Sequence, residues 1–100
     1  MSLESLTAAL RQQAAMAPKL GYRVKIDLGE TGLILWDGTG TKPEIGNEDG
    51  EADTTLKLSE KAFQDLMAGT LDPNMAYMTG KLKVSGSMGV ALKLAGLLSD

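Results

Sequence analysis

The sequence predicts an α+β domain in which a single, mainly antiparallel sheet of about five strands is covered on one face by helices. Apolar residues recur at helical spacing near both ends of the 100-residue chain. Its middle is dominated by alternating apolar and polar residues, which is typical of strands with one wet face. A short turn with a glycine at each end joins the first two strand segments as a hairpin. Strands grouped together with helices gathered around them indicate an α+β domain.

The N-terminal part predicts a helix followed by this hairpin. Residues 2–17 carry leucines at spacings of three and four, as in an amphipathic helix that Ser2 opens and Pro18 ends. Residues 22–28 alternate and predict a half-buried strand. Residues 33–36 are apolar without alternation, so we expect a central strand that is covered on both faces.

The next part predicts a loop, a strand and a helix. Residues 37–51 contain four glycines, one proline and five acids, a composition typical of a mobile loop. One weak strand is expected within them at 43–45. Residues 52–59 alternate again and predict a strand. Ser59 then caps a helix over 60–68, which a glycine ends.

The C-terminal part predicts a short helix, a strand and a final helix. Asp72 and Pro73 indicate a helix start, because the carboxylate can accept hydrogen bonds from the first turn and proline has no N–H there. Gly80 is the matching stop. Residues 81–85 alternate as a strand, and from Met88 onward apolar residues recur at helical spacing.

Composition narrows the classes of protein to which the chain can belong. One hundred residues are enough for one domain, so residues 1–100 are expected to form a single unit. A net charge of −3 argues against a nucleic-acid partner, because binding phosphates requires clustered Lys and Arg. No apolar run approaches the roughly 20 residues of a membrane span, and no signal peptide is visible. We therefore expect a cytoplasmic protein.

The residue types needed for catalysis or metal binding are largely missing. Histidine and cysteine are absent, which removes the commonest general base and the best nucleophile. A Ser-Lys pair stays formally open, although solvated lysines are the simpler interpretation. The acidic stretch at 47–51 lacks the ligand spacing of a calcium loop, because Gly50 comes too early. We expect no enzymatic activity, no catalytic residue, no metal and no cofactor.

The C-terminal part also carries an ordered set of residues that resembles a known family. The set comprises Leu71-Asp72-Pro73, Ala76-Tyr77, Gly80-Lys81-Leu82-Lys83-Val84, Gly86 and Ala91-Leu92-Lys93-Leu94, with Phe63, Leu66 and Gly69 upstream. It resembles the closing segment of the sterol carrier protein type 2 family, and the general layout is similar over essentially all 100 residues. The resemblance implies a small domain that holds a lipid in an apolar tunnel between the sheet and its helices. It implies a fatty acid, an acyl-CoA ester or a sterol-like molecule as ligand.

Methionines add a second indication of a ligand. All except Met1 and Met16 fall between the second helix and the start of the last one. Their thioethers suit surfaces that repack around guests of variable shape, although they also fill gaps in small cores. Together with the resemblance, this pattern predicts ten ligand-binding residues. They are Leu35, Trp36, Phe63, Leu66, Met67, Met75, Met78, Leu82, Met88 and Leu92.

Two functions remain open from the sequence. The first is non-enzymatic binding and transfer of a lipid. In this case the protein would be a monomer or weak homodimer that contacts membranes transiently. The second is an accessory or interaction domain with a closed core, which pairs with itself or with a lipid-metabolising enzyme.

Overall fold

A computed structural model describes residues 2–16 and 20–98 of the chain. It contains four α-helices, five strands and one 3-10 turn. In chain order these are α1 (Leu3–Met16), β1 (Arg23–Asp27), η1 (Gly29–Thr31), β2 (Leu33–Asp37), β3 (Glu44–Gly46), β4 (Thr54–Leu58), α2 (Glu60–Ala68), α3 (Pro73–Met78), β5 (Leu82–Gly86) and α4 (Met88–Leu98). The predicted helix stop at Pro18 lies outside the described residues.

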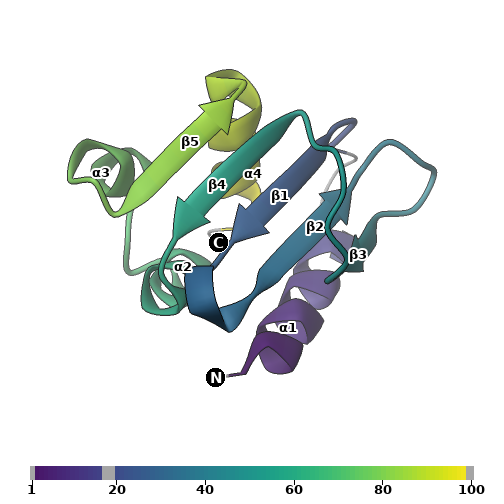
Figure 1. Ribbon diagram of the computed structural model, residues 1–100, viewed down its shortest axis with the longest axis horizontal. Helices are drawn as coiled ribbons and strands as arrows, with labels where there is room; N and C mark the ends of the chain where they lie inside the picture. Colours follow the sequence, from purple (N-terminus) through teal and green to yellow (C-terminus); the bar gives the residue numbers. More distant parts are fainter. Residues whose placement is uncertain (1, 17–19, 99–100) are drawn as a thin grey trace.

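The five strands form one sheet in the order β3-β2-β1-β4-β5. The central pair β1 and β4 is parallel, and the other neighbouring strands are antiparallel. Figure 1 shows α1 and α4 behind the sheet and no helix in front of it. The predicted α+β class, with a mostly antiparallel sheet covered on one face, is confirmed.

Strand β2 differs from its prediction in one respect. It lies inside the sheet between β3 and β1, as expected. However, only Ile34 and Trp36 are buried, whereas Leu33 and Leu35 are half-buried on the open face. The expectation that both faces are covered is wrong, because all four helices leave that face free. Leu35 gains partial cover from the following loop, where a Cβ on Gly50 would lie 3.2 Å from Leu35 Cδ2.

The predicted helix signals are in place. The Ser59 hydroxyl accepts a hydrogen bond from the Ala62 N–H at 3.0 Å and starts α2. The Asp72 carboxylate accepts one from the Met75 N–H at 3.1 Å and starts α3. Gly80, with φ of 80°, follows the end of α3 in the left-handed conformation that favours glycine. These local rules therefore fix where α2 and α3 begin and where α3 ends.

The buried side chains form one apolar cluster between the sheet and the helices. Leu6 and Leu10 of α1 enter it from one side, and Phe63 and Leu66 of α2 from another. Leu94 of α4 completes the layer. Burial of apolar side chains is the main favourable term in folding, so this cluster is the principal source of stability.

Gly86, the last residue of β5, lies where β5 comes very close to the start of β4. Its φ is 100°, and an added Cβ would lie 2.6 Å from the Asp53 carbonyl oxygen. We expect Gly86→Ala to lower the free energy of unfolding by about 1–3 kcal/mol, through backbone strain and this clash. Urea denaturation measures the difference. Gly89→Ala is the control, because a Cβ at that helical position meets nothing within 4 Å. Equal free energies of unfolding for the two variants would contradict the close approach of Gly86 to Asp53.

Candidate functional site

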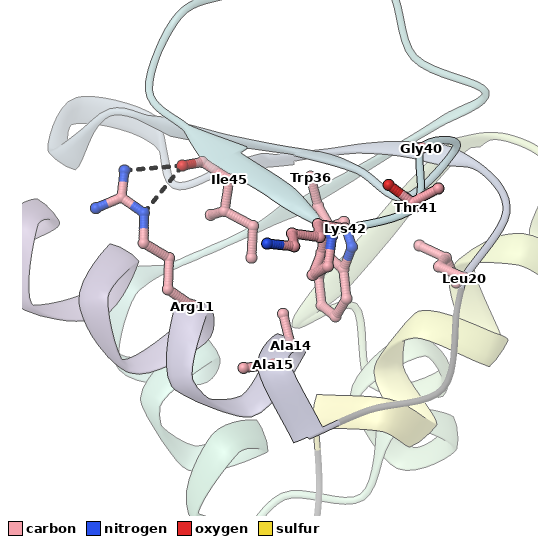
Figure 2. A pocket seen from close by; sticks show the side chains of 11 residues that line it. Arg11, Ala14, Ala15, Leu20, Trp36, Gly40, Thr41, Lys42 and Ile45 are labelled. Carbon is pink, nitrogen blue, oxygen red and sulfur yellow. Dashed lines mark hydrogen bonds between the residues drawn. The ribbon is translucent and has the colours of Figure 1, made fainter.

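A pocket of about 550 Å³ lies between α1, the end of β2, the loop after it and β3. Figure 2 shows the side chains that surround it. The lining residues are Arg11, Ala14, Ala15, Leu20, Trp36, Gly38, Gly40, Thr41, Lys42, Pro43 and Ile45. This volume falls within the roughly 300–1,000 Å³ of small-molecule sites in proteins.

Small residues around one large side chain create this space. The buried stripe of α1 begins with leucines and ends with Ala14, so its last turn projects little toward the sheet. Trp36 faces the pocket from β2, with 2% of its surface exposed. On the far side Gly38 allows Leu20 to pack against the chain, because a Cβ there would lie 2.8 Å from Leu20 Cβ. The pocket is therefore left open by short side chains on both sides of an indole.

Two cations also line the pocket. Arg11 Nε and Nη2 donate hydrogen bonds to the Ile45 carbonyl oxygen at 3.0 and 2.8 Å, as the dashed lines in Figure 2 show. The Lys42 side chain overlaps the Trp36 side chain in that view, and its terminal nitrogen lies to the left of the indole. Neither cation forms an ion pair with a carboxylate of the described residues, whereas Arg23 and Lys25 do so elsewhere. The pocket thus combines an apolar wall with unneutralised positive charge.

The loop that covers the pocket is fixed near its start. Thr39 donates hydrogen bonds from its N–H and its hydroxyl to the Asp37 carboxylate. These bonds, followed by the nearby Arg23 guanidinium, lower the pKa of Asp37 below its ordinary value. The carboxylate is therefore ionised near neutral pH and keeps accepting these bonds.

Two buried side-chain polar atoms lack a hydrogen-bond partner among the described residues. They are Gln13 Oε1 and Trp36 Nε1. Only Trp36 belongs to the pocket lining.

Of the ten ligand-binding residues predicted from the sequence, only Trp36 lines this pocket. Leu35, next to it on β2, points to the opposite face and lines a second hollow of about 460 Å³. Period-two alternation along a strand makes this unavoidable, because neighbouring side chains occupy opposite faces.

Five of the other predicted residues lie in or beside the core. Phe63, Leu66 and Leu82 are buried in the apolar cluster. Met67 is half-buried against this cluster, and Met88 is half-buried at the start of α4. Their contact with a ligand stays a prediction.

The last three predicted residues are exposed. Met75 and Met78 of α3 have exposed fractions of 53% and 77%, because Ala76 is the residue of this helix that faces the core. Leu92 of α4 is 38% exposed. This helix turns Val90, Ala91 and Leu94 toward the core, which leaves Leu92 on its outer side.

Sequence reasoning missed the rest of the lining, above all Arg11 and the alanines of α1. The usable signal was the change from leucine to alanine along the buried stripe of α1. The composition of residues 37–51 predicts a mobile loop, whereas part of this loop forms a wall of the pocket.

Comparison with known proteins gives a consistent result. The family model described as "SCP-2 sterol transfer family" matches residues 3–99. Human sterol carrier protein 2 is 43% identical over 53 residues, which cover 53% of this chain and 10% of that protein. The hydroxysteroid dehydrogenase-like protein 2 of Bos taurus is 39% identical over 72 residues, which cover 72% of this chain and 17% of that protein. The chain thus spans less than a fifth of either relative.

Among solved structures, a palmitated SCP2L2 from Aedes aegypti has a TM-score of 0.68 to this chain. The two are 21% identical, and the match covers 98% of this chain and 95% of that one. At this identity the likeness shows the shared fold.

Arg11 provides a test of how α1 is joined to β3. Arg11→Ala removes two charge-assisted hydrogen bonds and leaves the Ile45 carbonyl without them, so the free energy of unfolding should fall by about 1–3 kcal/mol. Arg23→Ala is the control, since its ion pair with Asp37 is exposed and should contribute less than about 1 kcal/mol. Chemical denaturation of both variants measures the difference. A smaller loss of unfolding free energy for Arg11→Ala than for Arg23→Ala would show that the hydrogen bonds between Arg11 and Ile45 do not stabilise the contact of α1 with β3.

Proposed function

The chain belongs to the SCP-2 sterol transfer family, and from this premise we propose that it binds a lipid in the pocket between α1 and β3 without catalysing a reaction. The observation that carries the proposal is the pocket itself, whose volume of about 550 Å³ suits a small amphiphile. The proposed ligands are fatty acids, acyl-CoA esters or sterol-like molecules. Transfer of the bound lipid between membranes is part of the proposal.

The physical chemistry of the pocket suits an amphiphile with an acidic head. Each methylene buried against Trp36, Leu20 and Ala14 contributes about 0.8 kcal/mol. Arg11 and Lys42 can form charge-assisted hydrogen bonds with a carboxylate or phosphate. The palmitated state of the Aedes aegypti protein supports a fatty acid as a candidate.

The rival interpretation, an accessory domain with a closed core, is less well supported. A closed core would place apolar side chains where the structure leaves the pocket, and the family match favours a lipid carrier. The name of the bovine relative refers to a protein of which this chain spans 17%, so no dehydrogenase activity follows. The proposed role is therefore to bind and transfer a lipid without catalysing a reaction.

We also propose a transient membrane contact through α3. Met75, Tyr77 and Met78 leave its outer surface apolar, with exposed fractions of 53%, 45% and 77%. Residues 73–98 contain three lysines and no acid, and Lys81 and Lys83 beside α3 are exposed and without ion pairs in the described chain. Apolar side chains next to basic ones favour anionic lipid surfaces. None of the described helices could span a membrane.

Ligand binding should be visible as thermal stabilisation. At a ligand concentration of 100 times the dissociation constant, binding stabilises the folded state by about 2.7 kcal/mol. For a domain of this size the melting temperature should rise by roughly 10–20 °C. Ala15→Phe, which fills the pocket from α1, should abolish this rise with palmitate. Ala8→Phe is the control, because it introduces the same ring at an exposed position of α1 outside the pocket. No rise with any fatty acid, acyl-CoA ester or sterol would contradict the proposal, as would an unchanged rise in Ala15→Phe.

The membrane contact can be tested by flotation with vesicles. Met78→Glu should reduce the fraction bound to phosphatidylserine-containing vesicles several-fold, because it places a negative charge in the contact. Met16→Glu is the matched control, since Met16 is 83% exposed but lies on α1. Equal binding of wild type and Met78→Glu, or equal losses in both variants, would show that α3 is not the contact surface.

A further inference from the structure

We propose that the indole N–H of Trp36 determines which lipids the pocket accepts, by donating a hydrogen bond to an oxygen atom of the ligand. Lipids that bring an acceptor oxygen into the pocket are then bound more tightly than chains that are apolar throughout. This inference rests on the proposed function, because it assigns ligand selectivity within the same pocket.

The first support is an unsatisfied donor. Trp36 is 2% exposed, and its Nε1 has no acceptor among the described residues. An indole nitrogen can only donate, so no rearrangement of its own hydrogens relieves the deficit. Buried donors without partners are costly and therefore rare in folded proteins. A ligand oxygen would satisfy this one.

The second support is the position of the ring. In Figure 2 the indole lies near Ala14 of α1 and Lys42 of the covering loop in the view shown, and all three residues line the pocket. Arg11 and Lys42 lie in the same lining and have no carboxylate partner in the described chain. An oxygen that carries negative charge would gain from the positive charge of this lining as well as from the N–H. A neutral hydroxyl or carbonyl oxygen would gain from the N–H alone.

The third support explains how an oxygen can reach a covered donor. The loop residues Gly40, Thr41, Lys42 and Pro43 form no hydrogen bond and no ion pair with the described chain. The chain is held on either side of them, by the bonds of Thr39 to Asp37 and by those of Arg11 to the Ile45 carbonyl. This segment can therefore move over the indole while its ends stay in place.

The single tryptophan of the chain makes the proposal directly measurable. In a ¹⁵N-labelled sample of the full chain, the indole N–H gives one cross-peak of its own. Titration with decanoate should move its proton resonance downfield, in step with the amide signals of Ala15 and Ile45. Titration with 1-decanol should move it in the same direction by a smaller amount, which distinguishes a charged from a neutral acceptor. Shifts at Ala15 and Ile45 without any indole shift would overturn this inference and leave lipid binding intact. No shift at any of the three would overturn both.

Replacing only the indole N–H of Trp36 tests whether this group determines ligand selectivity. Replacing Trp36 with β-(3-benzothienyl)alanine exchanges the N–H for sulfur and keeps the two fused rings. Affinity for 1-decanol should fall roughly 2- to 12-fold, and affinity for decanoate by 10-fold or more, as expected for hydrogen bonds to neutral and charged acceptors. Replacing Trp36 with 7-azatryptophan, which keeps the N–H, should preserve both affinities.

The ligand-free variants supply the control for a merely structural role. If the donor has no partner in the empty protein, the benzothienyl variant should melt at the same temperature as the wild type or above it. A lower melting temperature together with unchanged affinities would show that the N–H serves the fold and would overturn the inference.

Discussion

The structure depends on one constraint, which is that a sheet covered on a single face needs apolar side chains from the helices opposite every inward-facing strand position. Leu6 and Leu10 meet this need along most of α1 and are completely buried. One turn later the same stripe continues with Ala14, which is buried but short. The pocket lies at this point, opposite Trp36. A binding site thus arises where the covering layer becomes thin, without any change in the backbone pattern.

Polar contacts hold the sheet edge where apolar ones are missing. Strand β3 has only three residues, and its Ile45 carbonyl receives two hydrogen bonds from Arg11. Just beyond it, Asn47 Nδ2 donates to Thr7 Oγ1 at 3.0 Å and to the Leu33 carbonyl at 2.9 Å. These bonds tie α1 to the sheet at Arg11, which lines the pocket, and one turn earlier at Thr7. They allow the pocket to stay open without the dense packing that stabilises the rest of the core.

Much of the fold could be predicted from the sequence, because the signals for it are local. Ser59, Asp72 and Gly80 mark helix ends through their own side chains or backbone freedom. Coverage of β2 could not be predicted in this way, since an apolar run such as residues 33–36 does not show which face meets a helix. Loop packing over Leu35 supplies part of its cover instead.

The candidate site was harder to predict, because alanine and glycine leave space for a pocket through the absence of a large side chain. Their small side chains leave no pattern comparable to a stripe of leucines or methionines. The sequence predicts that the methionines of α3 contact the ligand. However, Ala76 is the buried residue of this six-residue helix, and Met75 and Met78 are exposed. Only Trp36 was both predicted and found in the lining, and it is the large residue against which the small ones leave space.

The most direct test of this account locates the bound chain in solution. A stearic acid that carries a nitroxide near its carboxyl group broadens the NMR signals of the residues that lie close to that end of the ligand. The account predicts that broadening centres on Ala15, Trp36 and Ile45 and leaves Met75 and Met78 sharp. Broadening centred on Phe63, Met75 and Met78, with Ala15 and Ile45 unaffected, would contradict it.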